Sequence, residues 1–209
     1  MADRVLWGVG SARALRAHWA LAELGLDYRT EKVQSRTGQT RTETFDRLNP
    51  RRKIPVLQDG ELTLTESAAI VTYLAERYSG PAARLIPEAV AERARYFEWQ
   101  SFVCMELDAT SLYVLRRHVY LPEVYGEAPT AAAAAEAYFA RMIEAAARLV
   151  DDGRPYLLGE TFSGVDILLA TTLDWAANYG QPLPAPFPAY RERLAARPAH
   201  IAAREANQP

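Results

Sequence analysis

The segment Asn49–Tyr73 restricts the possible fold more than any other part of the chain. It reads as an extended arm, a strand, a two-residue turn, a second strand and a helix. Asp59-Gly60 lies between two apolar runs, and this dipeptide in that setting is a strong signal for a β-hairpin. Thr65 is predicted to cap the helix that follows. The helical stripe consists of Ala69, Ile70, Tyr73 and Leu74.

Two features of this segment suggest a binding site. Pro55 lies at the start of the first strand, where it removes a backbone donor and stiffens the chain. This leaves the N–H and C=O of Ile54 free to pair with an extended group such as a short peptide. Glu66 and Ser67 fall in the first helical turn, where backbone amides favour an anionic group. A hairpin followed by a well-capped helix explains the same residues, so both interpretations remain open.

Composition and charge exclude several classes of protein. The 209 residues fit one large or two modest domains. The 24 basic residues are scattered and are balanced by 26 acidic ones, which argues against a nucleic-acid partner. No apolar run approaches the roughly 20 residues of a membrane span, and no signal segment precedes the first strand. Cys104 is the single cysteine, so an internal disulfide is excluded and the cytoplasm is predicted.

Residues 1–78 are predicted to form an α/β domain. Arg4–Gly8 is a short apolar strand, and Ala12–Leu24 is a helix that Gly25 ends. Tyr28–Val33 reads as a second strand, so this βαβ unit should have parallel strands. A short helix near residues 42–48 follows, and the hairpin and helix of the segment Asn49–Tyr73 come after it. The predicted order of elements is therefore β-α-β-α-β-β-α.

The rest of the chain is predicted to be all-helical, with residues 79–87 as a linker and 88–209 as a second domain. Residues from Glu88 to about Leu121 should form one long helix, and the alanine-rich run Ala131–Ala135 begins another. Ser163 and Asp166 approximate a capping box for a third helix, and loss of such a cap costs about 1 kcal/mol. One or two short helices follow a proline-rich loop.

The residues Asn49-Pro50, Lys53-Ile54-Pro55 and Glu66-Ser67-Ala68-Ala69-Ile70 resemble the glutathione-binding half of the cytosolic glutathione S-transferases. The resemblance extends over nearly the whole chain. It implies a thioredoxin-like N-terminal domain followed by an all-helical domain. It also implies a cis bond before Pro55, a backbone pairing of Ile54 with the cysteinyl part of glutathione, and a γ-glutamyl site at Glu66 and Ser67. Lys53 and Gln39 would meet the glycine carboxylate, although a solvated surface explains them equally well.

Transfer of glutathione requires a thiolate, and a thiol with a pKa of about 8.5 is only a few per cent ionised at pH 7. A hydrogen-bond donor aimed at the sulfur supplies the activation. In the resembling family this donor follows the first strand and is a tyrosine, serine or cysteine. The segment here is Val9-Gly10-Ser11-Ala12-Arg13, so Ser11 is the candidate, as in the serine-type, theta-like enzymes. If Ser11 only caps the helix, the donor would be Trp7, the Gly10 N–H or Arg13.

The resemblance also implies a second-substrate pocket along the long helix, and core packing or a solvated face is the alternative for each of its residues. The pocket would be lined by Met105, Leu112, Tyr113 and Arg116. The three histidines are too dispersed for a metal site, so no metal cofactor is expected.

The predicted function is a homodimeric glutathione S-transferase that uses glutathione as co-substrate and acts on a small hydrophobic electrophile. Two alternatives stay open. One is a glutathione-dependent isomerase or dehalogenase. The other is a non-catalytic glutathione-binding or interaction module, because a fold does not determine a function.

Overall fold

The computed structural model describes residues 4–209, so the first three residues of the predicted N-terminal domain lie outside it. The chain forms two compact units. The first contains the residues up to Pro87 together with Leu194–Pro209, and the second is Glu88–Arg193. The end of the chain, which the linear pattern grouped with the helical domain, therefore packs within the first unit.

The first unit is built on a four-stranded mixed sheet with the strand order β2-β1-β3-β4. β1 pairs with β2 in parallel, and the remaining pairs are antiparallel. These pairings confirm both the predicted βαβ unit and the predicted hairpin. The strands are β1 (Arg4–Trp7), β2 (Arg29–Glu31), β3 (Val56–Asp59) and β4 (Leu62–Thr65).

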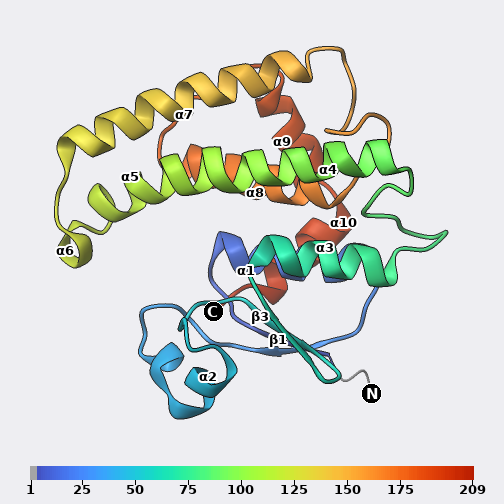
Figure 1. The fold of residues 1–209 in the computed structure, drawn as a ribbon, viewed down its shortest axis with the longest axis vertical. Coiled ribbons are helices and arrows are strands. Elements are labelled where there is room, and N and C mark those ends of the chain that lie inside the picture. Colours follow the sequence, from blue (N-terminus) through green and yellow to red (C-terminus); the bar gives the residue numbers. More distant parts are fainter. Residues whose placement is uncertain (1–3) are drawn as a thin grey trace. The chain divides into compact units, whose positions relative to one another are not determined.

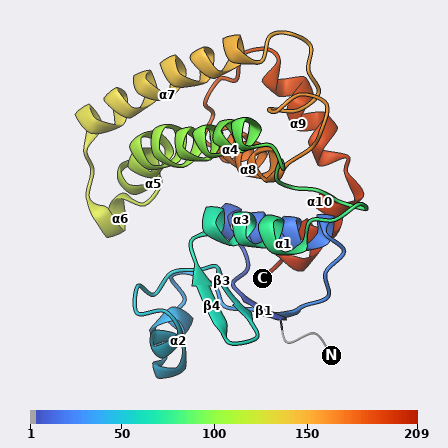
Figure 2. The ribbon, with the colours of Figure 1, turned by 45° about the vertical axis from the view of Figure 1, so that its right-hand side comes forward.

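Helices α1, α3 and α10 lie on one side of this sheet, and α2 lies away from them (Figures 1 and 2). α1 buries Trp19 and Leu21 completely, as expected for an amphipathic helix that covers a sheet. The predicted element order is confirmed, with one added 3₁₀ turn. The helical elements are α1 (Ala12–Glu23), η1 (Gln39–Arg41), α2 (Glu43–Leu48), α3 (Ser67–Tyr78) and α10 (Pro198–Ala206).

α10 is joined to α1 by a charged pair and by ring packing. The Arg197 guanidinium donates to both carboxylate oxygens of Glu23 at 2.6 and 2.7 Å. The rings of Trp19 and His200 lie 4.5 Å apart between their centroids. Because bidentate arginine–carboxylate pairs fix orientation as well as proximity, these contacts explain why the end of the chain belongs to the first unit.

The predicted cap of α3 is wrong by one residue. Thr65 is the last residue of β4 and pairs with Val56, so its backbone is committed to the sheet. Glu66 occupies the N-cap position with φ 69°, and α3 begins at Ser67. The chain thus passes from strand to helix through one residue in a conformation that is uncommon outside glycine.

The second unit is helical throughout, and Figure 1 shows α4, η2 and α5 as one continuous rod with α7 beside it. All of its residues are described, and apart from an isolated bridge between Tyr156 and Gly159 they form no β-structure. No helix within residues 4–209 has the length and apolar character needed to span a membrane. Its elements are α4 (Val90–Phe102), η2 (Val103–Leu112), α5 (Tyr113–His118), α6 (Pro122–Tyr125), α7 (Pro129–Leu149), α8 (Gly164–Asn178) and α9 (Phe187–Ala195), the last of which ends in the first unit.

The middle of the predicted long helix, η2, has π-helical geometry. Two hydroxyls bond back to carbonyls five residues earlier: Thr110 donates to Met105 O and Ser111 to Glu106 O, each at 2.8 Å. Such side-chain bonds compete with the regular helical ladder. The sequence pattern predicted the extent of this helix but not its wider winding.

The predicted capping box at the start of α8 is confirmed and is larger than expected. The fully buried Asp166 carboxylate accepts from Ser163 N and Oγ, from Leu157 N and from the Tyr190 hydroxyl, each at 2.8 Å. Burial raises the pKa of Asp166, and these hydrogen bonds counteract the rise. The cluster ties α8 to the preceding loop and to α9, and its role is structural.

Candidate active site

The loop after β1 packs directly against Ile54. Gly8 has φ 128°, and a Cβ placed on it would lie 2.7 Å from Cβ of Ile54, closer than real contacts allow. The Ile54–Pro55 bond is cis, which confirms what the resemblance implied. The absence of a side chain at Gly8 therefore brings the Gly8–Ser11 loop and the predicted peptide-binding residue into contact.

The backbone of Ile54 is available, as the sequence predicted. Ile54 lies just before β3, which starts at Val56. Within residues 4–209, no group accepts from its N–H or donates to its C=O. A backbone pair of this kind is normally satisfied by the protein, by water or by a bound group. Ile54 can therefore pair with an extended ligand without breaking an existing bond.

Ser11 is the N-cap of α1, and its Oγ accepts from the Ala14 N–H at 3.0 Å. The side chain is half-buried. A hydroxyl that accepts one hydrogen bond still carries a proton to donate. The capping role that the sequence offered as an alternative is thus present, and it is compatible with donation to a sulfur.

Two of the alternative donors are already engaged. The Gly10 N–H donates to Asn207 O at 2.8 Å, and the Trp7 indole N–H donates to Gln58 Oε1 at 2.7 Å. Asn207 Nδ2 also donates to the Ser11 carbonyl at 3.2 Å. Asn207 thus holds the loop on both sides of the Gly10–Ser11 bond. Sequence reasoning missed it because it lies 196 positions from Ser11, and no local pattern signals such a contact.

His18 also supports this loop. Its Nε2 lies 3.1 Å from Gly8 O, and its Nδ1 lies 2.8 Å from the Tyr28 hydroxyl. Because a carbonyl only accepts, Nε2 carries the proton and Nδ1 accepts from Tyr28. Burial lowers the pKa of His18 to about 4, with a smaller opposing contribution from the bond to Gly8. The ring is therefore neutral at pH 7.

Ser67 and Glu66 begin α3 in different environments. Ser67 is buried, and its Oγ lies 3.5 Å from a guanidinium nitrogen of the fully buried Arg16 on α1. The Glu66 side chain is exposed and pairs with Arg51 at 3.2 Å. Arg16 and Arg51 were not predicted as site residues, and both contacts depend on the tertiary fold.

Lys53 lies on the arm before Ile54 and Gln39 begins η1, and both residues are exposed. The Lys53 carbonyl accepts from Asn49 Nδ2 at 2.7 Å, which fixes the arm before Ile54. The Gln39 side-chain oxygen accepts from Gln34 N at 2.8 Å and from the Thr37 hydroxyl at 3.0 Å. Within the described chain neither side chain bonds to the other. The Lys53 ammonium forms no ion pair there, so it is available to an anion.

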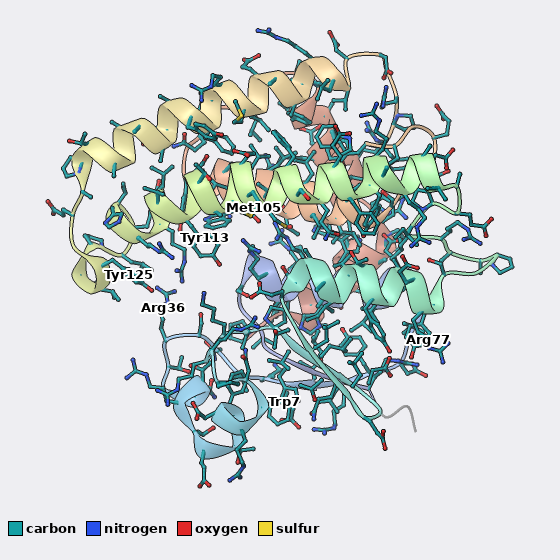
Figure 3. The ribbon with its side chains drawn as sticks, in the orientation of Figure 1. Trp7, Arg36, Arg77, Met105, Tyr113 and Tyr125 are labelled. Atoms are coloured by element: carbon teal, nitrogen blue, oxygen red, sulfur yellow. The ribbon has the colours of Figure 1, made fainter. Side chains whose placement is uncertain are left out.

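The residues predicted to line the second-substrate pocket separate into different environments in the helical unit. Met105 is 59% exposed on η2, whereas Leu112 is fully buried in the core. Tyr113 and Arg116 are neighbours, because the Arg116 guanidinium carbon lies 5.8 Å from the Tyr113 ring centroid. Figure 3 labels Met105 and Tyr113 along the same helical rod. In the part of the chain that the structure describes, no group of three His, Cys, Asp or Glu side chains is arranged to hold a metal ion.

Two family models match this chain. The N-terminal domain of glutathione S-transferase matches residues 3–76, and the C-terminal domain matches residues 129–198. Among solved structures, the theta class glutathione S-transferase of Xanthomonas axonopodis pv. citri with glutathione bound is similar. It is 32% identical with a TM-score of 0.78, and the match covers 97% of each chain.

Curated relatives agree with the family models. Glutathione S-transferase F14 of Arabidopsis thaliana is 30% identical over 188 residues, which are 83% of this chain and 66% of that protein. Glutathione S-transferase theta-1 of Bos taurus is 34% identical over 102 residues, 49% of this chain and 42% of that protein. The matched parts thus span less than two thirds of these relatives. The chain belongs to the glutathione S-transferase family.

The neutral, buried His18 predicts a pH-dependent stability. The unfolded chain takes up a proton near pH 6.5, whereas the folded protein does so only near pH 4. The free energy of unfolding should therefore fall as the pH drops from about 6.5 to about 4, by roughly 3 kcal/mol in total. Denaturant unfolding at a series of pH values measures this, and His18→Gln should reduce the slope.

His118→Gln is the matched control, because His118 lies at the end of α5 in the other unit. It should keep the wild-type slope. If His18→Gln also keeps the full slope, other groups cause the pH dependence.

Proposed function

We propose that this protein is a glutathione S-transferase, which binds glutathione in its first unit and activates the thiol for attack on a small hydrophobic electrophile. The observation that carries the proposal is the unpaired backbone of Ile54, held against Gly8 in the same unit as the buried Ser67 at the start of α3. Extended peptides bind to free backbone edges of this kind. The relatives named above are glutathione S-transferases, and one was solved with glutathione.

In the proposed complex, the N–H and C=O of Ile54 pair with the cysteinyl part of glutathione beside Pro55. Glu66 and Ser67 hold the γ-glutamyl end, and the amides at the start of α3 favour its carboxylate. Lys53 and Gln39 meet the glycine carboxylate.

The charge of the surrounding segment agrees with an anionic ligand. Residues 32–53 contain seven Lys or Arg and only two Asp or Glu. This excess of positive charge attracts anions at long range.

Ser11 is the proposed thiol-activating residue. Its hydroxyl donates to the sulfur and stabilises the thiolate, while its oxygen continues to accept from Ala14 N–H. The position at the N-terminus of α1 also favours negative charge. The thiol proton passes to solvent, and the thiolate forms a C–S bond as the leaving group departs with its electron pair. His18 and Asn207 hold the loop that positions Ser11.

We also propose that the protein is a cytoplasmic homodimer. The dimer is proposed by analogy with the family, and the cytoplasm because the chain has a single cysteine. Sedimentation at micromolar concentration should give a mass near twice 23.3 kDa. A species of monomer mass alone, or fractionation outside the cytoplasm, would contradict the respective part of this proposal.

Gly8→Ala should weaken glutathione binding without abolishing folding. The new Cβ meets Ile54 at 2.7 Å, so the backbone that pairs with the ligand must shift. We expect an affinity loss of about 10-fold or more, which corresponds to one impaired hydrogen bond. Calorimetric titration with glutathione measures it.

Gly60→Ala is the control for the loss of stability that comes from placing alanine in a positive-φ conformation. Gly60 also has positive φ (59°), but a Cβ placed on it would meet no other atom within 4 Å. This variant should lose about 1 kcal/mol of stability and keep the wild-type affinity. Equal affinities for wild type and Gly8→Ala would refute the proposed role of Ile54.

Ser11→Ala should separate capping from catalysis. Loss of the cap should cost about 1 kcal/mol of stability, and glutathione affinity should stay nearly intact. If Ser11 donates to the sulfur, the pKa of the bound thiol should rise and turnover at neutral pH should fall. Loss of one oxyanion donor typically costs about 10²–10³ in rate, and a softer thiolate should lose less.

The measurement is the thiolate absorbance of bound glutathione against pH, in wild type, Ser11→Ala and Ser11→Thr. Thr keeps both the acceptor and the donor, so it should restore the wild-type titration. Should the Ala and wild-type titrations coincide while turnover is unchanged, Ser11 is only a helix cap.

A further inference from the structure

The fully buried Arg16 contacts the residue at which the γ-glutamyl end of glutathione is proposed to bind. Arg16 lies on α1, and its exposed fraction is 0%. Its guanidinium nitrogen Nη1 donates to Ser67 Oγ at 3.5 Å, and Ser67 itself is only 2% exposed. Little water reaches a cation at this depth, so its charge acts on neighbouring groups with little screening. Any ligand group that meets Ser67 is therefore subject to this positive charge.

The contact with Arg16 also fixes the direction in which the Ser67 hydroxyl can donate. A guanidinium group carries donors only, so the Ser67 oxygen is the acceptor in this pair. The hydroxyl proton points away from Arg16, and no group within residues 4–209 accepts it. A carboxylate oxygen of a ligand can accept this proton. A ligand ammonium offers no acceptor, and the guanidinium would repel it.

The backbone at the start of α3 adds further donors. The N-cap residue Glu66 makes no capping bond with its side chain, and the first turn contains no acidic residue. Within the described chain, no group accepts from the amide N–H of Ala68 or Ala69. Free amides at a helix N-terminus favour an anion. The amides, the Ser67 hydroxyl and the Arg16 charge therefore favour the same kind of ligand group, a carboxylate.

From these contacts we infer that Arg16 is a positioning residue that determines how the γ-glutamyl end of glutathione is oriented. Arg16 does not touch the ligand. It holds the Ser67 hydroxyl ready to donate, and its charge favours the α-carboxylate over the ammonium group at Ser67. This inference rests on the proposed transferase function. It adds a residue that determines specificity, because a thiol peptide without this carboxylate should bind much more weakly.

The two probes are glutathione and γ-aminobutyryl-cysteinylglycine, which lacks only the α-carboxylate of the γ-glutamyl residue. The measured quantity is the dissociation constant of the analogue divided by that of glutathione, from calorimetric titration of the full chain. A purely structural role of Arg16 would leave this ratio unchanged, because it would weaken both peptides equally. Wild type should give a ratio of about 100, since the carboxylate accepts at least two charge-assisted hydrogen bonds worth roughly 10-fold each.

Variants at the two contacting residues separate the charge of Arg16 from its contribution to packing. Arg16→Gln removes the charge, so the ratio should fall about 10-fold. Arg16→Lys keeps the charge and should restore most of the wild-type ratio. Ser67→Ala removes the hydroxyl that Arg16 orients and should also lower the ratio about 10-fold. Arg77→Gln is the matched control, because Arg77 lies in the last turn of the same helix, and it should keep the wild-type ratio (Figure 3).

The outcomes separate this inference from the function on which it rests. If wild type binds and conjugates glutathione but Arg16→Gln keeps the wild-type ratio, the role of Arg16 is refuted and the transferase function stands. In the event that both Arg16 variants fail to fold, an undiminished ratio in Ser67→Ala, or equal affinities of wild type for the two peptides, refutes the inference. If wild type binds neither peptide, the proposed function is refuted together with the inference.

Discussion

The candidate active site depends on the contact between Gly8 and Ile54. Gly8 is fixed on three sides: its N–H donates to Glu31 O at 3.0 Å, its carbonyl accepts from His18, and its α-carbon faces Ile54. These contacts join β2, α1 and the arm before β3 at one residue. Because a side chain at this position would meet Ile54 at 2.7 Å, the site requires glycine for steric as well as conformational reasons. The unpaired backbone of Ile54 is held in place by this contact.

The same loop also depends on the end of the chain. Asn207 follows α10 and bonds to Gly10 and Ser11, and α10 is held on α1 through Arg197 and Glu23. Within the first unit, the position of Ser11 is therefore fixed by residues from both ends of the sequence. A loop that carries a functional group gains precision when rigid elements support it. Here α1 and α10 provide that support, and this is the structural reason for grouping Leu194–Pro209 with the sheet.

The sequence predicted the parts of the fold that short-range rules determine. The Asp59-Gly60 hairpin, the parallel βαβ unit and the Ser163–Asp166 cap all depend on residues close together in the chain, and all are present. The support from Asn207 depends on a tertiary contact, which no local pattern encodes. The error at Thr65 has the same origin. Cap propensity favoured Thr65, but pairing with Val56 kept it in the sheet and moved the strand-to-helix transition to Glu66.

The charge distribution of the first unit favours an anionic ligand there. The chain has a net charge of −2, yet the segment 32–53 holds seven Lys or Arg against two Asp or Glu. Such a local excess of positive charge attracts an anion at long range. Lys53, whose ammonium forms no ion pair within residues 4–209, directly precedes Ile54, whose backbone is unpaired in the same part of the chain. One short arm therefore offers both a cation and a backbone donor, and a hairpin that only needed to pack would require neither of them.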